Sequence, residues 1–224
     1  MERRYYRIDF TDNLRVVGNV YPQIDSLHKY DKNHYPGAWD WLSEEEIAHT
    51  LYESKLRRGA KLTDILNPHR STDPGLVFSE RVKTILSEYR LWEHQYIKGT
   101  LTVRDKVYPY YWLHFRLPGI PLQYIDYAKC IFACVYMGNK PSSIIHINSH
   151  EEYRDISEQR DNLIAFIELR EVVLTDDFTD DYDMLVVEGH TGVFISARLR
   201  ERLAREKITG YDILDRDFVE FAYR

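Results

Sequence analysis

The chain has 224 residues, of which 44% are hydrophobic and 14% aromatic, and its formal net charge is −6. This apolar content excludes a disordered chain, and the negative charge argues against general nucleic-acid binding, which needs a cationic surface. No run approaches the roughly 20 apolar residues that span a bilayer, and residues 1–13 lack an apolar signal-peptide core, so we expect an unexported, cytoplasmic protein without a membrane or nucleic-acid partner.

The N-terminal quarter of the chain predicts two strands and a helix. Residues 5–10 and 15–21 are typical of strands that are separated by a polar turn. Ser43, with Glu46 three residues later, forms a capping box, which satisfies the first backbone N–H groups of a helix. The apolar stripe that follows runs as far as Lys55 and predicts a helix, which Gly59 is placed to end.

The middle of the chain predicts one more helix and two strands. An extended entry ends at Ser79, the expected N-cap, and apolar residues then recur at helical spacing over residues 80–90. Residues 94–103 and 107–117 are rich in aromatic and β-branched residues and predict strands.

The second half of the chain predicts mainly strands. Residues 151–161 are expected to form a helix or an ordered loop, and a helix capped by Ser196 is expected at 197–207. The expected strands are 124–137, for which a partly helical structure is the alternative, and 142–149, 162–174, 184–189, 192–196, 210–214 and 217–224. The prediction is an α+β fold, a mostly antiparallel sheet with a few helices packed on it, in one domain over residues 1–224.

One stretch of the sequence occurs twice in similar form. Aligned without a gap, residues 74–97 place Ser79 on Ser196, Arg81 on Arg198 and Leu86 on Leu203 in residues 191–214. This predicts two related strand–cap–helix–strand units, at about 75–115 and 192–224. The alternative is that any strand followed by a capped helix resembles another for physical reasons alone.

The same region resembles a family of bacterial immunity proteins from polymorphic toxin systems, long described only as a domain of unknown function. Four stretches carry the resemblance: "TDIL" at 63–66, the apolar–Ser–x–x–apolar helix start at 77–82, "HQY" at 94–96, and "YPYYWLHF" at 108–115. The closing stretch "GVFISARLRERLAREKITGYDIL" is similar to the last element of the family. The chain departs from the family pattern after "HQY", where the family has a further aromatic residue and this chain has Ile97.

This resemblance implies a protein that binds a cognate toxin domain and neutralises it stoichiometrically, with no catalytic residue, metal or cofactor. Two other functions remain open from the residues alone. One is a small metal-dependent hydrolase that uses the acidic segment 176–183, and the other is a ligand-binding module built on the tyrosine-rich strand.

Acidic residues are concentrated in one segment. Residues 151–190 contain 13 Asp and Glu against 3 Lys and Arg. The acidic residues are densest at 176–183, and a solvated turn would explain them. The spacing of these residues lacks the alternation, central Gly and terminal Glu of an EF-hand calcium loop. The interpretation with a function is a patch that steers a basic toxin and binds it, formed by Asp176, Asp177, Asp180, Asp181 and Asp183.

The strand at 107–117 offers a second candidate surface. Tyr108, Tyr110, Trp112 and His114 alternate with residues of the opposite face. Tyr and Trp are enriched in interface hot spots, so this face is expected either in the core or at the partner interface.

Overall fold

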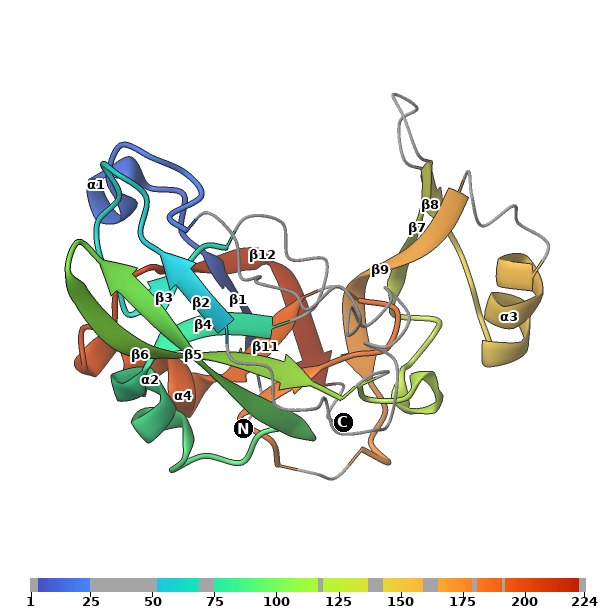
Figure 1. Ribbon diagram of the computed structural model, residues 1–224. Coiled ribbons are helices and arrows are strands. Elements are labelled where there is room, and N and C mark those ends of the chain that lie inside the picture. Colours follow the sequence, from blue (N-terminus) through green and yellow to red (C-terminus); the bar gives the residue numbers. More distant parts are fainter. Residues whose placement is uncertain are drawn as a thin grey trace, which may run out of the picture.

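The structure, a computed structural model, describes residues 4–24, 52–68, 75–116, 119–136, 143–158, 165–178, 181–190 and 192–221. Over these ranges the fold is α+β, with two mostly antiparallel sheets and helices at their ends and sides (Figure 1). The predicted fold class is therefore confirmed.

The larger sheet has seven strands, and its central strands come from the two ends of the chain. Among its described strands, only β12 (Tyr211–Phe221) and β9 (Ala165–Leu174) form a parallel pair. Across the sheet the order is β10 (Met184–Val186), β11 (Val193–Ser196), β1 (Arg4–Phe10), β12 (Tyr211–Phe221), β9 (Ala165–Leu174), β7 (Ile131–Tyr136) and β8 (Ser143–Ile145).

The smaller sheet has five strands from the middle of the chain. Its centre is the long hairpin of β5 (His94–Val103) and β6 (Lys106–Phe115), which pair over their whole length. The order is β2 (Tyr52–Lys55), β5 (His94–Val103), β6 (Lys106–Phe115), β4 (Gly75–Ser79) and β3 (Ile65–Leu66), with β2 parallel to β5.

The described residues include the helices α1 (Leu14–Val17), α2 (Glu80–Leu86), α3 (His150–Glu158) and α4 (Ala197–Arg205) and a short 3-10 turn, Leu122–Tyr124. Helices α2 and α4 lie side by side (Figure 1), joined by an ion pair between Arg202 and Glu88 at 3.4 Å. Helix α3 lies at the far end of the seven-stranded sheet (Figure 1). Among the residues that the structure describes, no helix combines the length and the apolar character that a membrane crossing requires.

Each sheet buries side chains on both faces. The largest core lies between the sheets, where Phe78 and Leu113 of the smaller sheet meet Ile195 of the larger sheet and Leu199 and Leu203 of α4. A second core covers the other face of the seven-stranded sheet and includes Tyr5, Phe132 and Leu169. A third lies on the outer face of the five-stranded sheet around Ile97, Leu101 and Trp112.

Two predictions for the N-terminal quarter of the chain were wrong. Residues 15–21 were expected as a strand, but α1 begins at Leu14 because the Asn13 side chain accepts a hydrogen bond from the Arg15 N–H and caps a single turn. The helix expected to continue to Lys55 is replaced there by β2, which pairs with β5. Ser43 and Glu46 lie outside the described residues.

The strands predicted for the middle of the chain are confirmed as β5 and β6, and the helix predicted at 80–90 is confirmed over its first two turns as α2. The strands expected at 210–214 and 217–224 form one continuous strand, β12.

Candidate functional site

The acidic segment does not form one surface. Asp176 and Asp177 are exposed in the turn after β9, and Asp181 is exposed further along the chain. Asp183, in contrast, is 0% exposed. It was expected in the partner-binding patch, but its carboxylate is directed into the protein and cannot contact a partner. Asp180 lies outside the described residues.

Asp183 is the centre of a buried polar cluster. Its carboxylate accepts hydrogen bonds from the Ser196 hydroxyl at 2.7 Å and from the Arg90 backbone N–H at 3.0 Å. The Arg198 guanidinium binds both carboxylate oxygens, with its NH2 group at 2.6 Å from Oδ2. These bonds satisfy a buried charge, which would otherwise be strongly destabilising. The hydrogen bond to Asp183 also raises the pKa of Arg198.

The first copy of the doubled unit contains the same cluster in a looser form. The Ser79 hydroxyl donates to Asp64 at 3.3 Å, and the Arg81 guanidinium lies 3.9 Å from the other oxygen of the Asp64 carboxylate. The backbone repeats the arrangement as well, because Ser79 N–H donates to the Asp64 carbonyl and Ser196 N–H to the Asp183 carbonyl, both at 2.8 Å. The doubled stretch is therefore part of a larger repeated unit that starts with an aspartate.

Each unit donates a backbone hydrogen bond to the aspartate of the other unit. The segment after α2, in the first unit, donates the Arg90 N–H to the carboxylate of Asp183 in the second. The segment after α4, in the second unit, donates the Thr209 N–H to the carboxylate of Asp64 in the first, at 3.1 Å. The Thr209 hydroxyl also donates to this carboxylate at 3.0 Å. The carboxylates of Asp64 and Asp183 are thus each satisfied by groups from both units.

The two cap serines differ in what their side chains do. Ser196 occupies the N-cap of α4, and its Oγ accepts a hydrogen bond from the Leu199 N–H at 3.3 Å. Ser79 occupies the N-cap of α2, but its side chain makes no capping hydrogen bond. Its hydroxyl donates to Asp64 instead, so only the second serine stabilises its helix directly.

The tyrosine-rich strand has the expected alternation, but both of its faces are buried. Trp112 is 3% exposed and Tyr110 is 6% exposed, while Tyr108 is half-buried. The Tyr110 hydroxyl donates to the Thr63 carbonyl at 2.6 Å, and burial raises the pKa of this phenol. Burial also lowers the pKa of His114 to about 4. Of the three aromatic residues expected at a partner interface, only Tyr108 reaches the surface to any extent.

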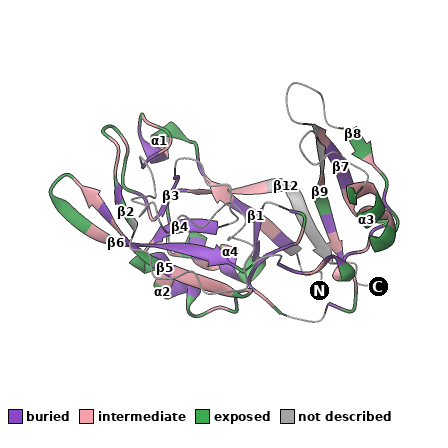
Figure 2. Ribbon diagram, turned by 45° about the vertical axis from the view of Figure 1, so that its right-hand side comes forward, coloured by how far each residue is buried: buried purple, intermediate pink, exposed green. Residues whose placement is uncertain are grey.

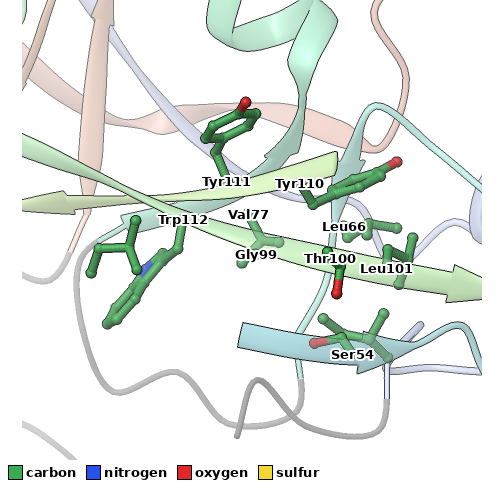
Figure 3. A pocket seen from close by; sticks show the side chains of 11 residues that line it. Ser54, Leu66, Val77, Gly99, Thr100, Leu101, Tyr110, Tyr111 and Trp112 are labelled. Carbon is green, nitrogen blue, oxygen red and sulfur yellow. The ribbon is translucent and has the colours of Figure 1, made fainter. Parts of the chain in front are cut away.

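A cavity lies beside this strand, between β2 and the β5–β6 hairpin (Figure 3). Ser54 and Thr100 direct hydroxyls into a lining that is otherwise mostly apolar, with Leu66, Val77 and Leu101 (Figure 3). Its volume is about 20 Å³. A ligand pocket for an organic molecule has roughly 300–1,000 Å³, whereas about 10–15 Å³ suffices for one water. The cavity therefore has room for water and not for the ligand that a binding module would need.

The chemical alternatives gain no support from the described residues. No three or more His, Cys, Asp or Glu side chains among them are placed to hold a metal ion. Both cysteines are free, and burial raises the pKa of the Cys130 thiol to about 11. That thiol is therefore protonated at neutral pH and a poor nucleophile.

Comparison with known proteins gives no assignment. No protein-family model matches the sequence, and no curated protein matches it.

Proposed function

We propose that this protein is an immunity protein, which acts in the cytoplasm by binding a toxin domain and blocking it without catalysis. The proposal comes from the sequence resemblance, and one observation of the fold supports it. The stretches that carry the resemblance, 63–66, 77–82, 94–96 and 108–115, fall on β3, on β4 and α2, on β5 and on β6. The four strands among these elements are neighbours in one sheet, so the resemblance concerns a folded unit and not scattered residues.

The negative surface charge of helix α3, at the end of the molecule far from these strands, supports a cationic partner (Figure 1). Helix α3 exposes Glu151, Asp155 and Glu158, and Glu158 lies in an ion pair with Arg154 at 3.7 Å. Figure 2 shows this helix largely exposed at the edge of the molecule. Together with Asp176 and Asp177, these carboxylates would attract a toxin domain that carries a basic cleft and would raise the rate of association.

The test is rescue of growth. Toxin domains encoded next to this gene would be expressed with and without the protein, and we expect the protein to restore growth and to form a stoichiometric complex with one of them. A catalytically inactive toxin variant, used as control, should form the same complex. Continued growth arrest in cells that contain the folded protein and each neighbouring toxin would contradict the proposal.

A further inference from the structure

A groove lined by cations lies at one end of the five-stranded sheet. It runs between the connection that follows β2, residues 56–62, and the tip of the β5–β6 hairpin, residues 103–108, and its volume is about 700 Å³. The hairpin tip and α3 lie at opposite ends of the molecule (Figure 1). An acidic chain therefore carries a basic groove at the end that is far from its acidic helix.

Among the described residues that line the groove, cations outnumber carboxylates. Arg57, Arg58, Arg104 and Lys106 line it, against the single carboxylate of Asp105. Arg58, Arg104 and Lys106 are exposed, and within the described part of the chain none of the three forms an ion pair with a carboxylate. Arg57 donates to the Pro22 carbonyl at 3.4 Å, which holds it in place at the wall.

The floor of the groove is apolar. Leu56, Val103 and Tyr108 are half-buried and pack against the outer core of the five-stranded sheet. Leu62 at the rim is 42% exposed. An apolar side chain placed on this floor would remove these groups from water, which contributes about 25 cal/mol for each Å² of apolar surface buried. The groove therefore suits an occupant with both carboxylates and an apolar side chain.

The turn at the hairpin tip places Arg104 at the wall of the groove. This residue has a φ of 55°, in the left-handed region that glycine adopts easily and other residues adopt at a cost. The cost is about 1–2 kcal/mol for a residue with a side chain. A two-residue hairpin turn needs a positive φ at its first residue. Arg104 occupies that position between β5 and β6, and its side chain is one of the cations of the groove.

We propose that this groove binds an acidic segment of a partner protein. One aliphatic or aromatic side chain of the segment lies on Leu56, Val103 and Tyr108, and the carboxylates around it face Arg58, Arg104 and Lys106. A protein segment fits better than a nucleic acid, because the net charge of −6 would repel a polyanion that extends beyond the groove. The site is separate from the acidic surface of the proposed function and can be tested without a toxin.

The probe is the acidic peptide Asp-Asp-Phe-Asp-Asp, titrated into the full-length protein and followed by backbone amide chemical shifts. We expect shifts confined to residues 56–62 and 103–108 and a dissociation constant that increases with salt. The peptides Ser-Ser-Phe-Ser-Ser and Lys-Lys-Phe-Lys-Lys should bind at least about tenfold more weakly, because they lack the ion pairs.

Variants locate the site. Replacing two groove cations, Arg58→Glu with Lys106→Glu, should weaken the acidic peptide about tenfold, the effect of two partly exposed ion pairs. The matched control, Lys98→Glu with Lys207→Glu, changes the net charge equally at exposed positions outside the groove and should leave binding unchanged.

Arg104→Gly separates binding from stability. Glycine relieves the backbone strain, so the variant should unfold at the same or a higher urea concentration while it binds the acidic peptide several-fold more weakly. Equal affinity for the acidic, neutral and basic peptides would overturn the proposal, and so would shifts outside the groove. Tighter binding of an oligothymidine, or self-association that is lost on reversing the charges of α3, would overturn it in favour of a nucleic acid or a second copy of this chain.

Discussion

Asp64 and Asp183 hold equivalent positions, each one residue before the first strand of its unit, and the carboxylate of each accepts a backbone hydrogen bond from the other unit. Their surroundings differ in a way that has energetic consequences. Asp183 is fully buried and bound by both nitrogens of the Arg198 fork, whereas the Asp64 side chain is 18% exposed and its arginine, Arg81, lies 3.9 Å away.

This difference predicts unequal effects of removing the two carboxylates. Asp183→Ala leaves the Arg90 N–H and the Ser196 hydroxyl without their acceptor and should lower the free energy of unfolding by about 3 kcal/mol. Asp64→Ala should lower it by about 1 kcal/mol, since solvent can replace the lost partner. Urea unfolding measures both, with Asp177→Ala as a surface control. Equal losses at the two positions would contradict the ranking of the clusters.

The cap serines provide an independent comparison of the two units. Ser196→Ala removes both the hydrogen bond to the Leu199 N–H and the one to Asp183, so we expect a loss of about 1–2 kcal/mol. Ser79→Ala removes no capping bond and should cost about 0.5 kcal/mol. The difference in the urea midpoints tests this, and a larger loss for Ser79→Ala would show that the side chain of Ser79 contributes more than its 3.3 Å contact indicates.

The sequence predicted the features that depend on neighbouring residues. The alternation in β6 and the inward faces of α4, with Leu199 and Leu203 buried, follow from local periodicity. It did not predict that both faces of β6 are buried, because the residues that cover the outer face, such as Ile24, are far away along the chain.

The role of Asp183 could not be predicted for the same reason. Its Arg90 donor is 93 residues away, and a run of carboxylates otherwise looks like a solvated turn. One signal was present in the sequence: Asp64 and Asp183 are each followed by two apolar residues, "DIL" and "DML". The aspartates precede their cap serines by 15 and 13 residues, so an alignment without gaps does not pair them.

The junction between the units also depends on a glycine. Gly210 has a φ of +97°, and a Cβ there would lie 1.9 Å from the Ile65 carbonyl oxygen of the first unit. Gly210→Ala should therefore lower the free energy of unfolding by more than about 3 kcal/mol. Gly59 has a similar φ of +94°, but its Cβ would meet only the Val20 side chain at 3.1 Å, so Gly59→Ala should cost about 1 kcal/mol. Similar losses in thermal or urea unfolding would argue against the close contact at Gly210.

Acid should destabilise the protein through His114. Burial lowers the pKa of this imidazole from 6.5 to about 4, so the unfolded chain takes up a proton before the folded one does. Stability is therefore complete above pH 6.5 and falls as the pH decreases from 6.5 toward 4, by at most about 3 kcal/mol. His114→Gln should remove this slope, which urea unfolding across the same pH range would detect. A variant with the wild-type slope would assign the effect to other groups, such as His94, whose pKa burial also lowers.

The exposed carboxylates of the acidic turn should control how fast a basic toxin domain associates. Asp176→Asn, Asp177→Asn and Asp181→Asn together remove three charges without opening the core, because all three side chains are exposed. At low salt we expect the association rate constant to fall about tenfold while the dissociation rate changes little, since exposed charges act mainly on the encounter step. The control removes three exposed carboxylates elsewhere, by Asp12→Asn, Glu201→Gln and Asp212→Asn. If the control slows association equally, the net charge of the protein would be responsible and not the position of the turn, and high salt should abolish the difference in either case.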